Sequence, residues 1–166
     1  MDLKKLSTGE SVIAGSGLLL LIFSFFKWYS FGGGSVDVGG TSIDLDLPGG
    51  SLNGWQAPSS FLSIVAILIG VAAAGYVIAT KLGGVDLPAK LGGTGMGLIL
   101  LVAGAVAFVF LAIKYLSNTE GPEKFGFYIS ILASIGLAVG GFLTAKERGE
   151  LPTKLGGSGS ASPPTA

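Results

Sequence analysis

The sequence predicts an all-α membrane protein, a four-transmembrane-helix bundle with a β-hairpin in its first extracytoplasmic loop. Three observations support this fold class. Of the 166 residues, 49% are hydrophobic and only 12% are charged, whereas a soluble domain usually carries roughly twice that share of charge. Four apolar stretches are long enough to cross a hydrocarbon core, which takes about 20 helical residues. A Gly-rich segment with alternating apolar and acidic residues separates the first two stretches.

The apolar stretches divide the chain into a membrane domain and a tail. The domain covers residues 1–146, with a long outer loop at 32–60, and the tail covers 147–166. We expect the tail to be flexible, because a Gly, Ser and Pro composition buries too little apolar surface to order itself. The predicted spans lie near Val12 to Phe31, Phe61 to Thr80, Gly97 to Leu116 and Phe125 to Ala145.

Basic residues near the span ends predict the orientation, because cytoplasmic loops hold an excess of Lys and Arg. Only Lys27, Lys114 and Lys124 fall on the side of the long loop. The other side carries the remaining basic residues, namely Lys4, Lys5, Lys81, Lys90, Lys146, Arg148 and Lys154. We therefore expect a multi-pass protein of the plasma membrane with both termini in the cytoplasm.

Lys27 stands inside an aromatic run, FSFFKWYSF, at residues 23–31. Within the predicted first span it lies near the outer interface, where its ammonium group can extend outward past Trp28 and Tyr29. These two residues, together with Trp55 at the chain's re-entry, are expected to be interface anchors at headgroup depth, as is Lys27 itself. An alternative is an ion pair with an acidic residue of the outer surface, with Asp44, Asp46 and Glu120 as candidates.

A cleaved signal peptide is an alternative interpretation of the first span, because Lys4 and Lys5 precede an apolar run. We favour a retained span. The run extends too far, Asp2 and Glu10 dilute the basic region, and no small-x-small site precedes a mature domain.

The outer loop predicts a β-hairpin. Residues 36–38 and 43–47 alternate apolar and acidic side chains, and Gly39 and Gly40 between them suit a tight turn. We expect the apolar face to lie on the outer ends of the helices and the acidic face to meet water. The acidic face consists of Asp37, Asp44 and Asp46. The three aspartates are not spaced along the sequence as the ligands of a dedicated calcium-binding loop are, so we predict no metal site.

The segment LPAKLGGTG at 87–95 recurs 64 residues later as LPTKLGGSG at 151–159. The same offset of 64 residues aligns the second predicted span with the fourth. A duplicated helical hairpin with parallel repeats explains this similarity. Convergent composition of Gly-rich linkers explains it equally well.

Small residues recur at four-residue intervals in two of the spans. In lipid, helices associate by close approach of their backbones, so such stripes mark helix contacts. The predicted packing residues are Gly70, Ala74, Gly136 and Gly140. We expect contacts within the chain to be their main use, and the sequence leaves open whether a second copy also uses them.

The composition argues against most chemistry. The chain has no Cys and no His, which removes thiol nucleophiles, the usual zinc sites and His-ligated haem. The cores of the spans hold no ionisable group of the kind that ion-coupled transporters require. The chain has a net charge of zero, so it lacks the positive charge that attracts nucleic acids, and we predict no nucleic-acid partner. We therefore predict no catalytic residue, no cofactor and no enzymatic activity.

Several segments together resemble a family of small four-span integral membrane proteins of actinobacterial type, whose function is unknown. They are FFKWYS at 25–30, NGWQA at 53–57 and the last span, GFYISILASIGLAVGGFLTAKE, and the similarity covers most of residues 11–148. The chain departs from the family at Lys27, where members often have Pro. The resemblance implies the four-span topology and no particular chemistry.

These observations predict a structural or accessory subunit that acts through helix contacts and its outer loop. Its expected partners are the lipid bilayer and either other membrane proteins or a second copy of itself. A passive channel or small-molecule transporter is the alternative.

Overall fold

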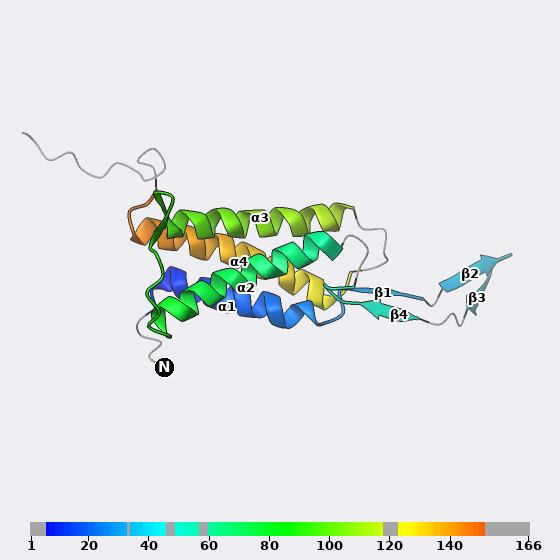
Figure 1. Ribbon diagram of the computed structural model, residues 1–166. Helices are drawn as coiled ribbons and strands as arrows, with labels where there is room; N and C mark the ends of the chain where they lie inside the picture. The colour runs from blue at the N-terminus through cyan, green and yellow to red at the C-terminus, as the bar shows by residue number, and fades with distance from the viewer. Residues whose placement is uncertain (1–5, 33, 46–48, 57–59, 118–122, 152–166) are drawn as a thin grey trace, which may run out of the picture.

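The protein is a bundle of four helices with a two-stranded ribbon at one end (Figure 1). The computed structural model describes residues 6–32, 34–45, 49–56, 60–117 and 123–151. Around the bundle, α1 lies between α2 and α4, and α3 contacts the same two helices on the opposite side. The helices are α1 (Thr8–Ser24), α2 (Ser60–Lys81), α3 (Met96–Leu116) and α4 (Phe125–Glu147).

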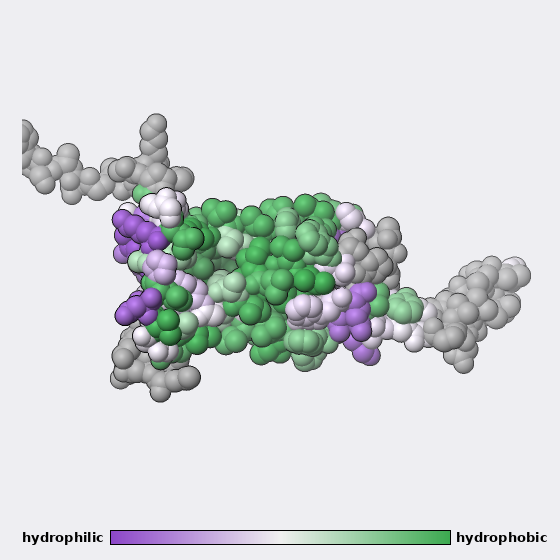
Figure 2. Space-filling view, viewed as in Figure 1, coloured by the Kyte–Doolittle hydropathy of each residue, from purple (hydrophilic) through white to green (hydrophobic). Residues whose placement is uncertain are grey.

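Three helices are long and apolar enough to cross a membrane, and they are α2, α3 and α4. Their bounds agree with the predicted spans to within about two residues, which is the usual uncertainty of helix ends. On the face that Figure 2 shows, the surface of the bundle is apolar over its middle and hydrophilic residues gather towards the two ends. This distribution is the one that hydrocarbon, with water at both ends, requires.

The first helix differs from the prediction. Helix α1 has 17 residues and ends at Ser24, so it is roughly 26 Å long at 1.5 Å per residue. The predicted helical span to Phe31 is wrong at this end, and Lys27 is not a helical residue. The chain leaves the helix because strand pairing replaces helical hydrogen bonds there. Strand β1 (Tyr29–Phe31) pairs antiparallel with β4 (Gly50–Leu52).

A second ladder continues the first. Strand β2 (Gly34–Val38) pairs antiparallel with β3 (Thr41–Leu45), and Gly39 and Gly40 connect them with φ angles of 64° and 86°. Positive φ at both central residues is what a type I′ hairpin turn requires. The predicted hairpin is thus confirmed. We refer to β1, β2, β3 and β4 together as the ribbon.

The position of the hairpin differs from the expectation. We expected its apolar face to rest on the ends of the helices. Instead, β2 and β3 project away from the bundle, beyond the β1 and β4 ladder (Figure 1). Only the first ladder lies close to the helix ends, and the second extends the ribbon outward.

Helix α1 approaches its neighbours at glycines. A Cβ atom on Gly17 would collide with the carbonyl oxygen of Gly70 and lie 2.6 Å from the Cβ of Ala74, both in α2. On the other side, a Cβ atom on Gly140 of α4 would lie 2.8 Å from Cγ1 of Ile13. The predicted packing residues Gly70, Ala74 and Gly140 therefore lie at contacts within the chain.

Helices α3 and α4 also pack through glycines. A Cβ atom on Gly104 would collide with the backbone nitrogen of Ala138, and one on Gly141 with that of Leu101. Gly136 faces α1, where a Cβ atom would collide with the hydroxyl of Ser16. Backbones in such close contact gain dispersion energy and exclude lipid, which is how helices associate when water does not drive them together.

The first copy of the repeated segment forms a small hairpin of its own. Strand β5 (Lys90–Leu91) pairs with β6 (Thr94–Gly95) through a turn at Gly92 and Gly93, and the hydroxyl of Tyr76 donates to the carbonyl of Pro88 at 3.1 Å. The second copy, with the predicted flexible tail, lies outside the described residues from 152 onward. The question of a duplication therefore stays open.

The glycine contacts give a stability prediction. Gly140→Ala places a methyl group 2.9 Å from the carbonyl oxygen of Gly9, so we expect it to lower the free energy of unfolding by about 1–3 kcal/mol through overpacking. Gly75→Ala adds the same methyl group to α2 where nothing lies within 4 Å, and serves as the control. Thermal unfolding in detergent measures both. Equal stability of the two variants would contradict the packing described above.

Candidate functional sites at the two ends of the bundle

Polar and charged side chains concentrate at the two ends of the bundle, so these ends are the candidate functional sites. We name them by their central residues. The Glu10 end is where α1 begins and α2 and α4 finish, and the Trp28 end carries the ribbon.

At the Glu10 end, one carboxylate joins three helices. Glu10 occupies the first turn of α1 and its side chain is only 4% exposed. One of its oxygens lies 3.1 Å from Nζ of Lys81 and 2.8 Å from Nη2 of Arg148. Its other oxygen accepts a 3.1 Å hydrogen bond from the Ser7 backbone N–H. The end of α2 and the end of α4 are thereby tied to the start of α1.

These contacts shift two pKa values. Burial alone raises the pKa of Glu10, but the hydrogen bond from Ser7 and the interactions with Arg148 and Lys81 outweigh it and hold the pKa below its ordinary value of 4.5. Burial likewise lowers the pKa of Arg148, and the Glu10 carboxylate reverses that effect and raises it. Both side chains are therefore charged at neutral pH, which makes the cluster a structural ion pair.

A second carboxylate joins the remaining helix. Glu150, just beyond α4, accepts a 3.1 Å hydrogen bond from the backbone N–H of Leu98. That N–H belongs to the first turn of α3, where backbone donors have no partner inside the helix. Glu150 therefore caps α3, and the two glutamates together connect all four helices at this end.

Neither contact was expected from the sequence. A signal was present for one of them, because Ser7-Thr8-Gly9-Glu10 has the spacing of a capping box, and both of its hydrogen bonds are formed. The pattern carries no information about Lys81 or Arg148, which are more than 70 residues away along the chain.

At the Trp28 end, the Trp28 residue connects three segments. Its backbone N–H donates to the carbonyl of Leu52 at 2.8 Å, and its carbonyl accepts from the backbone N–H of Lys124 at 2.7 Å. Its indole N–H donates to the carbonyl of Phe23 at 2.8 Å. The end of α1, strand β4 and the start of α4 thus meet at one residue.

The aromatic anchors lie deeper than the sequence indicated. Trp28 and Tyr29 are both 0% exposed and contact the ring of Phe127 in α4, with centroids 5.3 Å and 5.5 Å away. Lys114, only 3% exposed, places its ammonium nitrogen 5.4 Å from the centre of the Tyr29 ring. These two rings are thus enclosed by protein and do not face outward as belt residues do, while their headgroup depth stays a prediction.

Trp55 is half-buried and lies beside the end of α1. Its indole N–H donates to the hydroxyl of Ser24 at 3.0 Å, and its ring stacks on Phe25 with centroids 5.8 Å apart. The re-entering chain is therefore fixed to α1 as well as to the ribbon.

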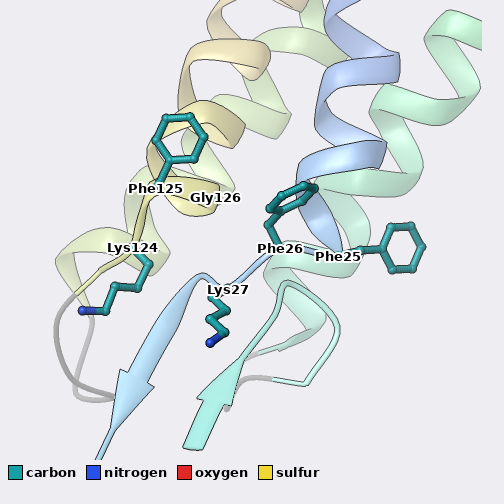
Figure 3. A pocket seen from close by; sticks show the side chains of 6 residues that line it. All are labelled: Phe25, Phe26, Lys27, Lys124, Phe125 and Gly126. Atoms are coloured by element: carbon teal, nitrogen blue, oxygen red, sulfur yellow. The ribbon is translucent and has the colours of Figure 1, made fainter.

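Lys27, by contrast, is exposed, and so is Lys124 at the start of α4. Both residues line an apolar cavity of about 550 Å³ between the end of α1 and the start of α4. The rings of Phe26 and Phe125 lie on the helix side of this cavity, the ring of Phe25 points away from Phe125, and both ammonium groups point away from the bundle (Figure 3). Phe25, Phe26, Phe125 and Gly126 complete the lining.

The predicted acidic face lies in the ribbon. Register places Asp44 opposite Ser35 and Asp37 opposite Ser42. Asp46 lies outside the described residues, as does Glu120. In the part of the chain that the structure describes, no three acidic residues gather as ligands for a metal ion.

Comparison with protein-family models, with curated proteins and with solved structures finds no match for this chain. The resemblance to a four-span family therefore stays a prediction.

The Glu10 cluster gives a second prediction. Glu10→Gln keeps the size of the side chain but removes the charge that pairs with Lys81 and Arg148, and we expect it to cost about 1–3 kcal/mol of unfolding free energy. Glu147→Gln, an exposed position in α4, should change stability by less than about 0.5 kcal/mol.

The pH dependence separates this charge effect from a packing defect. Because the folded pKa of Glu10 is lowered, its stabilisation is complete above the ordinary pKa and is lost as the pH falls through the folded value. The stability difference between the native chain and Glu10→Gln should therefore shrink on acidification in detergent. A difference that stays constant into strong acid would contradict the charge assignment.

Proposed function

We propose that the protein is a four-span integral membrane protein of the plasma membrane that acts as a non-enzymatic structural or accessory subunit. In this proposal the helices anchor it in the bilayer and the ribbon binds a partner outside the cytoplasm. The observation that carries the proposal is the ribbon, which projects from the bundle (Figure 1).

A fourth crossing by α1 is supported by its packing and its surface. The helix lies alongside α4 and α2 and makes close contacts with both. Its outward side chains are apolar, with Leu18, Leu19 and Ile22 exposed to 45%, 46% and 51%. The exposed rings of Phe25 and Phe26 extend this surface past the helix end. A 17-residue helix flanked by aromatic rings can cross a bilayer that thins slightly around it.

The orientation rests on the distribution of basic residues. Lys81, Lys146 and Arg148 belong to the Glu10 end, whereas Lys27, Lys114 and Lys124 belong to the Trp28 end. In the sequence, Lys4 and Lys5 precede α1 and add to the basic residues predicted for the cytoplasmic side. With the excess on the cytoplasmic side, the ribbon faces outward.

A binding role for the ribbon follows from its edges. In the outer ladder, β2 and β3 pair only with each other among the described strands, so the outer edge of each has no strand beside it there. Such an edge can accept an extended segment of another protein as an additional strand. The interior of the bundle, by contrast, is filled by large apolar side chains such as Leu20, Ile67 and Leu137, which disfavours a pore through a single copy.

Thiol labelling tests the topology. Because the chain has no cysteine, Asp44→Cys and Lys90→Cys each carry a single thiol, the first in β3 and the second in β5. We expect a membrane-impermeant maleimide to label Asp44→Cys on intact cells and to label Lys90→Cys only after the membrane is opened. The reverse pattern would invert the proposed orientation.

Removal of the outer ladder tests the function. Deletion of residues 34–45 takes away β2 and β3 and leaves β1 and β4 to pair as before. We expect the shortened chain to insert with unchanged stability but to lose the protein that crosslinking in native membranes attaches to the full chain. The Lys90→Cys chain is the control and should keep that protein. If the full chain and the deletion capture the same proteins in equal amounts, the ribbon is not the binding element.

A further inference from the structure

Two cavities meet at Lys27 and Lys124. The apolar cavity described above lies on the helix side, between the end of α1 and the start of α4. A second cavity of about 380 Å³ lies on the ribbon side and is lined by the same two lysines with Ser30, Phe31, Gly49, Gly50 and Ser51. The cavity on the helix side is therefore mostly apolar and the one on the ribbon side is more polar. The same two lysines line both cavities.

The backbone holds the two lysines together. The N–H of Lys124 donates to the carbonyl of Trp28, the residue after Lys27. At Gly126 there is no room for a side chain, because a Cβ atom would lie 2.9 Å from the carbonyl oxygen of Lys27 and 3.0 Å from the Cβ of Phe26. The start of α4 is thus pressed against the segment that carries Lys27. The two like charges are neighbours because the fold places them there.

Within the described ranges, neither lysine forms an ion pair with a carboxylate. Both remain exposed, and Figure 3 shows both ammonium groups directed to the same side, away from the helices. Two neighbouring cations that form no ion pair with a carboxylate of the described residues produce a local positive potential that attracts negative charge. The hydroxyls of Ser30 and Ser51 line the same polar cavity and can donate further hydrogen bonds.

The apolar side suits a hydrocarbon chain. Phe25, Phe26 and Phe125 are 63%, 51% and 64% exposed and line a cavity whose walls are mostly apolar. A soluble anion would leave these rings uncovered. An amphiphile covers them and neutralises the lysines at the same time.

We propose that this double cavity is a binding site for an anionic phospholipid, with an acyl chain against Phe26 and Phe125 and the phosphate between Lys27 and Lys124. The proposal rests on the membrane insertion proposed above, since the site then lies at the level of the headgroups. A bound lipid would seal the junction between α1 and α4 and brace the base of the ribbon.

Lipid titration of the purified full chain, followed by native mass spectrometry and thermal unfolding, tests this site. The probes are phosphatidylglycerol, phosphatidylcholine and inorganic phosphate. We expect phosphatidylglycerol to bind roughly thirtyfold more tightly than phosphatidylcholine, because each of the two lysines contributes about 1 kcal/mol near the membrane surface. Inorganic phosphate should not stabilise the chain, since it cannot fill the apolar cavity.

Variants separate this site from general attraction between charges. Lys27→Gln with Lys124→Gln should abolish the preference for phosphatidylglycerol, whereas Lys90→Gln with Lys146→Gln removes the same charge at the Glu10 end and should preserve it. The double variant Phe26→Ala with Phe125→Ala should weaken the binding of both lipids. The proposal is overturned if the native chain shows no preference, if the two lysine pairs behave alike, or if phosphate stabilises as well as the lipid does.

Failure of the lipid-site proposal can be distinguished from failure of the proposed accessory function. A chain that inserts and loses a partner on removal of residues 34–45 supports the accessory role whether or not it selects a lipid. A chain that binds neither lipid and stays in the aqueous phase contradicts membrane insertion itself.

Discussion

The hydrogen bonds of Trp28 are the constraint on which the rest of the Trp28 end depends. Its N–H, its carbonyl and its indole N–H bond to Leu52, Lys124 and Phe23 respectively, so one residue joins the end of α1 to the ribbon and to the start of α4. The residue is fully buried, and an unpaired polar group there would cost several kcal/mol in an apolar environment. The three segments therefore have little freedom to separate.

The Glu10 end is fixed by a different kind of contact. Glu10 binds Lys81 and Arg148, and Glu150 caps α3, so charged groups hold the helix ends where water is near. Between the two ends, glycines such as Gly17, Gly104 and Gly141 allow close backbone contact. Polar contacts thus hold the two ends of the bundle, and van der Waals packing holds its middle. This arrangement suits a bilayer, because the hydrocarbon core neither drives helices together nor solvates ions.

The features with a proposed role all depend on this arrangement. The ribbon leaves the bundle at Tyr29 and returns at Leu52, the two residues that begin and end its first ladder. Lys27 and Lys124 are neighbours because the backbone of α4 begins against Trp28. A lipid bound between the lysines would contact the elements that carry the ribbon, which links the membrane surface physically to the proposed partner-binding element.

The sequence by itself determined the bounds of α2, α3 and α4 and the hairpin at Gly39 and Gly40. The length of an apolar run and the alternation of strand residues are local properties, readable without knowledge of neighbours. Only the tertiary structure decided that α1 ends at Ser24, that Trp28 and Tyr29 are buried, and that the hairpin projects. It also decided that Glu10 pairs with Lys81 and Arg148. The physical reason is that these outcomes depend on partners distant in the chain. Leu52 and Lys124 form hydrogen bonds with the buried backbone of Trp28, and Phe127 packs against the rings of Trp28 and Tyr29.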